Sequence, residues 1–213
     1  MSDRNISKQT IRRIPIYLQH LKDLKIKNMT IISAPSVAAE LKLNEVQVRK
    51  DFAAMSTTHG KPKTGFIINE LIINMESFAG YNNTNEAILV GAGSLGKALL
   101  SYKGFEIYGL DIVAAFDIDS RLTGTEISGK VIFPLTEINE ISNKYNIKIG
   151  IITVPANEAQ KVCDVLVCSG IMAIWNFAPV HLTVPADILV QNENMAASLA
   201  MLSKHLREHI EGK

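Results

Sequence analysis

The sequence predicts an α/β protein in two parts, a small helical N-terminal domain followed by a doubly wound parallel sheet. In the first 80 residues, apolar positions recur at spacings of three and four, which is typical of amphipathic helices. After residue 86, helical patterns separate several of six β-branched apolar runs, as in parallel α/β sheets, and we expect each run to form a strand. The runs are AILVGAG, DIVAAFDID, KVIFP, IKIGIITVP, IMAIWNFAP and DILVQN. Residues 79–86 form a polar, turn-rich stretch between the two parts, and we expect a linker there.

Composition narrows the class of protein. The chain has 213 residues, of which 47% are hydrophobic, and it contains no apolar run long enough to span a membrane. The first residues lack the apolar core of a signal peptide, and 2 cysteines cannot form a disulfide framework. We therefore expect a cytoplasmic protein without a membrane partner.

Charge is divided unevenly along the chain. Residues 1–80 hold 12 Lys and Arg against 7 Asp and Glu, whereas residues 81–213 hold 10 against 14. A basic N-terminal part suits a polyanionic partner such as nucleic acid, but an ordinary solvated surface would give the same count. The local pattern has to decide between the two.

Three successive helices are expected in the N-terminal part. The first is a long amphipathic helix, the second begins at Ser33 with Pro35 in its first turn, and the third begins at Asn44. The expected buried positions of the first helix are Ile11, Ile14, Leu18, Leu21 and Leu24, and those of the other two are Val37, Leu41, Val48, Phe52 and Met55.

The exposed face of the third expected helix is basic. Arg49 and Lys50 lie opposite the buried stripe, and Gln47 lies on its flank, with Val46 and Ala53 as small apolar neighbours. The second helix of a helix-turn-helix presents such side chains to the major groove, where Arg and Lys donate to guanine. The alternative is a solvated helix face without a partner.

A basic loop follows this helix at residues 56–68. Gly60 and Gly65 punctuate the loop, and we predict a hairpin wing with Lys61 and Lys63 at its tip. Such a wing would contact the phosphate backbone or enter a minor groove. The loop therefore favours DNA as the partner of the basic helix.

The second part opens with a glycine-rich loop between an expected strand and an expected helix. Gly91 allows the turn, Gly93 allows a pyrophosphate to approach the backbone, and Gly96 allows the helix to pack closely on the strand. The predicted cofactor-binding residues of this loop are Gly91, Ala92, Gly93, Ser94, Leu95 and Gly96.

The next strong strand ends at Asp117, where a carboxylate can bind the ribose hydroxyls of an adenosine. An ionised Asp117 would repel the 2′-phosphate of NADP, so NAD is favoured. A capping role in the following turn is the alternative. Arg121 could accept that phosphate, but we expect it to be a turn residue or a neighbour of the pyrophosphate.

Two further strand ends carry polar residues in turns. Ligands of parallel sheets bind at such carboxyl ends, and backbone and amide groups there could hold the nicotinamide. Ordinary strand-to-helix turns are the alternative. The residues concerned are Thr153, Val154, Pro155, Asn176, Phe177 and Ala178.

Catalysis is not expected. A nicotinamide-dependent enzyme needs a proton donor beside the ring and a substrate domain. His181 is expected at the surface, His205 and His209 lie in a charged helix, and no spacing suggests a metal site. Cys163 and Cys168 are interpreted as small hydrophobic residues. A small NAD-dependent oxidoreductase or a CoA-binding protein remains the alternative.

The last expected helix has a near-heptad apolar stripe, and a helix-turn-helix reader normally works as a two-fold dimer on a two-fold site. We therefore expect this helix to pack on a second subunit. The stripe consists of Met195, Leu199, Leu202, Leu206 and Ile210.

The ordered motifs resemble the Rex family of redox-sensing transcriptional repressors. They are QVRKD at 47–51, GAGSLGKAL at 91–99, AAFDID at 114–119, GIITVPANEAQ at 150–160 and NFAPV at 176–180. The resemblance implies a winged-helix DNA-binding domain over residues 1–80 and a Rossmann NAD(H)-binding domain over residues 81–192. It also implies a C-terminal dimerisation helix over residues 193–213 that is exchanged between two subunits.

The resemblance further implies a function. A homodimer would bind an inverted-repeat operator in double-stranded DNA and release it when NADH binds, so that the NADH/NAD⁺ balance controls anaerobic or fermentative genes. The sequence departs from the family pattern in its wing, which reads Gly60-Lys-Pro-Lys-Thr-Gly65 in place of the usual Arg-Gly. It also has Asn194-Met195 where the family tends to have an acidic residue followed by Leu or Phe.

Overall fold

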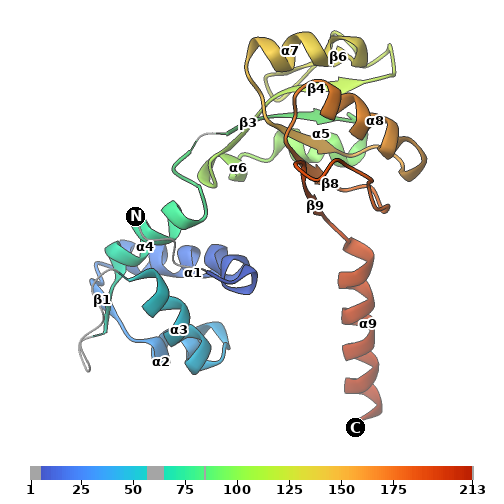
Figure 1. Cartoon of the computed structure of the whole chain (residues 1–213). Coiled ribbons are helices and arrows are strands. Elements are labelled where there is room, and N and C mark those ends of the chain that lie inside the picture. The colour runs from blue at the N-terminus through green and yellow to red at the C-terminus, as the bar shows by residue number, and fades with distance from the viewer. Residues whose placement is uncertain (1–5, 57–64, 84, 213) are drawn as a thin grey trace. The chain divides into compact units, whose positions relative to one another are not determined.

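The structure is a computed structural model of the whole chain, and it describes residues 6–56, 65–83 and 85–212. The chain divides into two compact units, Met1–Asn83 and Thr84–Lys213. Figure 1 shows the helices of the first unit in blue to teal and the sheet of the second in green to orange.

The N-terminal unit packs helices around one core and adds a short antiparallel sheet. Ser33 and Asn44 cap the second and third helices as predicted, because their side chains accept from the backbone N–H groups of Ser36 and Gln47 at 3.2 and 3.1 Å. The described elements are α1 (Lys8–Ile26), β1 (Ile31–Ile32), α2 (Ala34–Leu41), α3 (Glu45–Met55), β2 (Phe66–Ile67) and α4 (Ile68–Phe78).

The core of this unit follows the predicted stripes, except that Ile11 is exposed and Leu41 is only partly buried. Val37, Val48, Phe52 and Met55 are fully buried. The prediction for Ile11 was wrong: its side chain is 44% exposed. It lies at the margin of the stripe on α1, and the buried face is instead extended by residues that the sequence analysis did not select, Thr10 and Tyr17.

The C-terminal unit is a seven-stranded sheet of order β5-β6-β4-β3-β7-β8-β9. Every neighbouring pair is parallel except β5 and β6. The six predicted apolar runs all form strands, whereas β5 was not predicted. The described strands are β3 (Asn85–Val90), β4 (Leu110–Asp117), β5 (Glu126–Ile127), β6 (Lys130–Pro134), β7 (Ile149–Ile152), β8 (Ala173–Asn176) and β9 (Leu189–Asn192).

Helices cover both faces of this sheet, which explains the near-continuous apolar strands. On one face Leu166 packs with the strand residues Phe116 and Ile152, and on the other Leu100 packs with Leu89 and Ile151. Figure 1 shows α7 and α5 on opposite sides of the strands. The helical elements are α5 (Ser94–Ser101), α6 (Gly104–Ile107), η1 (Leu135–Glu137), α7 (Ile138–Lys144), α8 (Ala156–Cys168) and α9 (Met195–Glu211).

The order of the parallel strands is that of a doubly wound dinucleotide-binding sheet. Taken in chain order, the six parallel strands run 3-2-1-4-5-6 across the sheet. The winding therefore reverses between β3 and β7, which are hydrogen-bonded neighbours. Ligands of such sheets bind outside the carboxyl ends of the strands at this reversal point.

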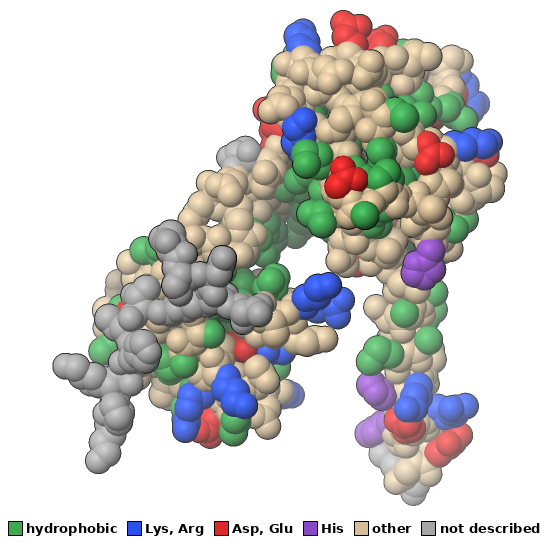
Figure 2. Space-filling view, viewed as in Figure 1, with side chains coloured by type: hydrophobic (Ala, Val, Ile, Leu, Met, Phe, Trp, Pro, Cys, Tyr) green, Lys and Arg blue, Asp and Glu red, His purple; other side chains and the backbone are tan. Residues whose placement is uncertain are grey.

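The helix α9 buries none of its residues. The five residues of its predicted apolar stripe are between 57% and 65% exposed. Figure 2 shows apolar side chains, in green, at the surface of this helix. Among the residues that the structure describes, no helix combines the length and the apolar character that a membrane span requires.

Candidate nucleotide crevice and nucleic-acid interface

The glycine-rich loop joins β3 to α5 and has the geometry that its sequence predicts. Gly91 has a φ of 103°, which disfavours any residue with a side chain. A Cβ atom on Gly96 would lie 2.0 Å from the carbonyl oxygen of Gly91, so the helix can approach the strand only through a glycine. A Cβ atom on Gly93 would meet nothing within 4 Å, because this residue faces open space.

That open space is a crevice of about 470 Å³. It lies over the carboxyl ends of β3, β4 and β7 and is bordered by the first turns of α8, at the reversal point of the sheet. Its lining is mostly apolar. The lining residues are Val90, Gly91, Gly93, Asp117, Ile118, Leu135, Thr153, Val154, Pro155, Glu158, Lys161, Val162 and Val165.

Asp117 lies at the crevice and is bound to the glycine-rich loop. Its Oδ2 atom accepts the backbone N–H of Ala92 at 2.7 Å, and its Oδ1 atom accepts that of Asp119 at 2.9 Å. The second bond is the capping role that the sequence left open. The carboxylate therefore combines a turn contact with a position at the crevice, and ribose binding stays a prediction.

Arg121 does not line the crevice. Its guanidinium is 87% exposed and makes an ion pair with Asp119, whose carboxylate it approaches at 2.7 Å. The side-chain and backbone hydrogen bonds from Arg121 lower the pKa of Asp119 to about 2. Arg121 thus acts in the turn after β4, which is one of the two roles expected for it.

Thr153 fastens the end of β7 to the glycine-rich loop. Its hydroxyl donates towards the carbonyl oxygens of Gly91 and Val90 at 2.7 and 3.0 Å. The next two residues, Val154 and Pro155, line the crevice. This strand end therefore belongs to the crevice as the sequence predicts.

The neighbouring strand end at Asn176 is arranged differently. Asn176 is fully buried, and its amide nitrogen donates to the carbonyl oxygen of Val180 at 2.9 Å. Its Oδ1 atom accepts the N–H of Ala178 at 3.0 Å. Asn176, Phe177 and Ala178 do not contribute to the crevice lining. The side chain of Asn176 organises the turn that contains the other two residues, and contact of the three with a nicotinamide stays a prediction.

The helix α3 exposes the predicted basic face. Arg49 and Lys50 are exposed, and Arg49 makes an ion pair with Glu45 one turn earlier. Gln47 is only half-exposed, and its amide nitrogen donates to Asp51 Oδ1 at 2.9 Å. The side-chain amide of Gln47 is therefore held in place by Asp51, a residue of the same helix.

Asp51 is the residue that the sequence analysis missed. It is 2% exposed, and its carboxylate accepts from Arg13 Nε at 2.7 Å, Tyr17 Oη at 2.8 Å and Thr10 Oγ1 at 3.0 Å. Burial favours a raised pKa for Asp51, but these hydrogen bonds outweigh it and lower the pKa. Burial and Asp51 also raise the pKa of Tyr17. These contacts join α1 to α3.

The predicted wing is only partly described. Its strand is β2, which pairs with β1, and Ile68 already begins α4. Gly65 has a φ of 77°, and a Cβ atom there would lie 2.8 Å from the carbonyl oxygen of Ile32. Lys61 and Lys63 lie outside the described residues.

Of the two thiols, only that of Cys163 is packed in the core as expected. Cys163 is buried on α8, and burial together with Asp164 raises its pKa to about 11. Cys168 is exposed. In the described part of the chain, no group of three or more His, Cys, Asp or Glu side chains is placed to hold a metal ion.

Two sequence families match the two units. Residues 5–53 match a family described as "Putative DNA-binding protein N-terminus", and residues 82–180 match the "CoA binding domain" family. A solved chain described as "Crystal structure of RSP in complex with beta-NAD+ and operator DNA" is 31% identical, with a TM-score of 0.86 and coverage of 98% of both chains. Another, in complex with beta-NADH, is 32% identical, with a TM-score of 0.85 and coverage of 96% of both.

Relatives whose names state a function align with nearly the whole chain. The redox-sensing transcriptional repressor Rex of Treponema denticola is 42% identical over 91% of both chains. That of Bacteroides fragilis is 38% identical over 94% of this chain and 91% of its own. These relatives are repressors, so the prediction that the chain is not an enzyme is confirmed. The chain belongs to the Rex family of redox-sensing transcriptional repressors.

Proposed function

We propose that this protein is a homodimeric repressor that binds an inverted-repeat operator in DNA and releases it when NADH binds. One observation carries the proposal: the same chain holds an exposed basic helix face and a crevice with dinucleotide-binding geometry. The first can read a major groove and the second can take a pyrophosphate. DNA and NADH meet in the cytoplasm, and we place the protein there.

For DNA binding, we assign base contacts to Arg49 and Lys50, which are exposed on α3. Gln47 is assigned to the edge of the same interface, with its amide fixed by Asp51. Lys61 and Lys63 are assigned to phosphate or minor-groove contacts of the wing. Phosphate contacts set affinity and salt dependence, whereas the contacts of α3 set the sequence that is read.

For cofactor binding, we assign the pyrophosphate to the loop from Gly91 to Gly96 and the ribose hydroxyls to Asp117. The loop leads into α5, whose first N–H groups favour an anion. Thr153, Val154 and Pro155 lead towards the nicotinamide, with Asn176, Phe177 and Ala178 at the next strand end. We assign Arg121 a supporting role through Asp119, because its side chain is outside the crevice.

The proposal is tested with gel-shift titrations of inverted-repeat DNA in the presence of NADH or NAD⁺. NADH should release the DNA at concentrations at which NAD⁺ does not. A parallel assay for NADH oxidation should show no turnover. Equal effects of the two cofactors, or no effect of either, would refute the redox response.

The crevice is tested with Gly93→Val. The φ of Gly93 is −70°, and its Cβ position is open, so valine fits the folded chain but fills the place of the pyrophosphate. We expect NADH affinity to fall by at least about tenfold and DNA to stay bound when NADH is added. Ala98→Val, at an exposed position of α5 outside the crevice, is the matched control and should behave as wild type.

A further inference from the structure

The start of α9 is bound to strand β8 through Glu193. The backbone N–H of Glu193 donates to the carbonyl oxygen of Asn176 at 2.8 Å. Its carboxylate oxygen Oε1 accepts the indole N–H of Trp175 at 2.9 Å. Since Trp175 and Asn176 are successive residues of β8, Glu193 is fixed by main chain and side chain at once. The N-cap residue of α9, Asn194, follows directly.

A second side-chain bond strengthens this connection. The amide nitrogen of Asn176 donates to Asn192 Oδ1 at 2.8 Å, and the two residues are paired in the β8–β9 ladder. The last two residues before the N-cap of α9 are therefore both bound to the strand end to which we assign the nicotinamide.

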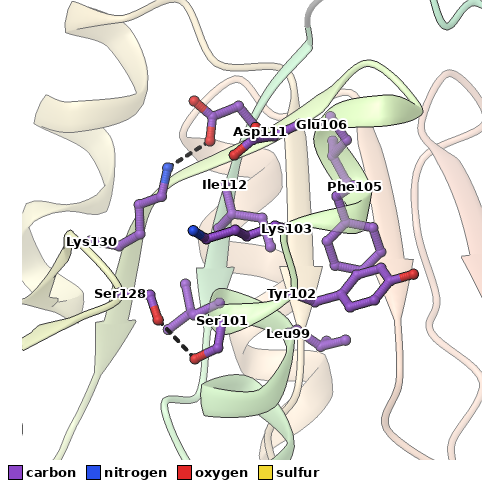
Figure 3. Close-up of a pocket in the computed structure, with 12 residues that line it drawn as sticks. Leu99, Ser101, Tyr102, Lys103, Phe105, Glu106, Asp111, Ile112, Ser128 and Lys130 are labelled. Carbon is purple, nitrogen blue, oxygen red and sulfur yellow. Dashed lines mark hydrogen bonds and ion pairs between the residues drawn. The ribbon is translucent and has the colours of Figure 1, made fainter.

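Trp175 also packs against that proposed nicotinamide segment. Its ring centroid lies 4.8 Å from that of Phe177 and 5.5 Å from that of Phe105. Phe105 in turn packs edge-on against Tyr102 at 4.9 Å. Figure 3 shows these last two rings side by side at the border of a pocket of about 80 Å³. One indole thus contacts the proposed cofactor segment and also binds the residue that leads into α9.

We propose that the Trp175–Glu193 hydrogen bond couples occupancy of the nicotinamide end to the position of α9. This inference rests on the proposed function and adds a positioning pair to it. A nicotinamide ring that shifts Phe177 also shifts the indole packed on it, because closely packed aromatic rings move together.

The single N–H of the indole then moves its acceptor. The side chain of Trp175 has one hydrogen-bond donor, and the partly buried carboxylate of Glu193 would lose a charge-assisted bond if it did not follow. The helix α9 has 17 residues and is about 25 Å long. A small tilt of α9 at its first residue therefore moves its far end several times further than its first turn.

The test compares variants that break the bond with one that keeps it. Glu193→Leu removes the acceptor, Trp175→Phe removes the donor but keeps an aromatic ring, and Glu193→Gln keeps an oxygen acceptor. The measured quantity is the ratio of operator affinities without and with NADH. We expect Glu193→Leu and Trp175→Phe each to lower this ratio about tenfold, and Glu193→Gln to leave it within about twofold of wild type.

Two controls separate coupling from binding and folding. Direct NADH titrations without DNA should give affinities within about twofold of wild type for all three variants, and circular dichroism should show the native helix content. The double variant Glu193→Leu with Trp175→Phe should be no worse than either single variant, because both remove the same bond.

Trp175 is the only tryptophan of the chain, so its fluorescence reports on this position alone. NADH absorbs light in the range in which tryptophan emits, so NADH should lower the emission of wild type and of Glu193→Leu alike. The ratio of operator affinities without and with NADH should nevertheless be about tenfold lower for Glu193→Leu than for wild type. This pair of results would show that the variant binds NADH without transmitting the signal.

Each other outcome decides the question. If wild type responds to NADH and the bond-breaking variants respond equally, the coupling role is refuted and the proposed function stands. If only Glu193→Leu loses the response while Trp175→Phe keeps it, the hydrogen bond is not the coupling element. If wild type itself does not respond, the proposed function fails.

Discussion

The helices α1 and α9 have similar amphipathic sequences and opposite surroundings. α1 buries one face in the core of its own unit, with Ile14, Tyr17 and Leu21 fully buried. α9 is of similar length, 17 residues against 19, and buries nothing. Leu199 and Leu202 on its stripe are 62% and 65% exposed.

The comparison teaches what an apolar stripe in a sequence means. An apolar stripe indicates that one face of a helix packs against a partner, because exposed apolar area costs free energy in water. The stripe does not indicate whether that partner belongs to the same chain or to another one. α1 has its partners within the chain, and we assign the partner of α9 to the second subunit of the homodimer.

Deletion of residues 193–213 is expected to have the largest effect. Without α9 the chain should be largely monomeric, bind the operator weakly and lose the response to NADH, while NADH binding itself persists in the sheet unit. Sedimentation velocity and gel shifts measure these properties. A truncated protein that stays dimeric and still releases the operator would refute the assignment of α9 to the dimer interface.

The buried contact between α1 and α3 should give the next largest effect. Asp51→Ala leaves Arg13 and Tyr17 without their acceptor and should lower the free energy of unfolding of the N-terminal unit by about 3–5 kcal/mol. Hydrogen exchange of the α1 and α3 amides measures this loss. Asp23→Ala, on the exposed side of α1, should change it by less than about 0.5 kcal/mol.

The same carboxylate predicts a dependence on pH. The pKa of Asp51 is lower in the folded protein, whereas an unfolded chain has the ordinary value of about 3.9. Its contribution to stability is therefore present above about pH 4 and is lost as the pH falls through the folded value. Asp51→Asn should lack this part of the acid destabilisation. An equal acid response in both proteins would contradict the assignment.

A matched pair of leucines compares the two helices directly. Leu21→Ala on α1 removes fully buried atoms and should lower the free energy of unfolding by about 2–5 kcal/mol. Leu202→Ala on α9 should leave the unfolding of the isolated chain almost unchanged but raise the dissociation constant of the dimer. Urea denaturation and dilution series give the two values. Equal unfolding losses would mean that α9 packs within its own chain.

The smallest effect is expected from substitutions on the polar face of α3. Like α9, this face does not pack into the core of its own unit. Arg49→Ala and Lys50→Ala should each weaken operator binding by about 1–3 kcal/mol and leave NADH affinity unchanged, because the residues belong to different units. Lys42→Ala, an exposed lysine at the end of α2, serves as a comparison. Unchanged operator binding in both α3 variants would refute the assignment of this face.

Much of the fold could be predicted from local patterns. Strands buried on both faces leave continuous apolar runs, and this signal located six strands of the sheet. The short strand β5 escaped because Glu126–Ile127 has neither the length nor the composition of such a run. The need for glycine at position 96 could also be predicted, since the carbonyl oxygen that limits it belongs to Gly91, a few residues earlier.

The hydrogen-bond partners of buried polar groups could not be predicted from the sequence. Asp51 lies in a charged segment and looks solvated in the sequence, but its partners Arg13 and Tyr17 are 38 and 34 positions away. For Asn176, the sequence does not show that the carbonyl oxygen of Val180 and the N–H of Ala178 bond its side-chain amide, and its contact with a nicotinamide stays a prediction. Hydrogen-bond satisfaction of a buried group is set by tertiary packing, so local patterns do not contain it.

The buried thiol of Cys163 has a consequence for how long a signal lasts. With its pKa raised to about 11, this thiol is reactive thiolate in only about one molecule in 10⁴ at neutral pH, and burial shields it further. Oxidants therefore react only slowly with this thiol. A response that depends on a bound dinucleotide ends when the dinucleotide dissociates. Oxidation of Cys163 does not prolong that response.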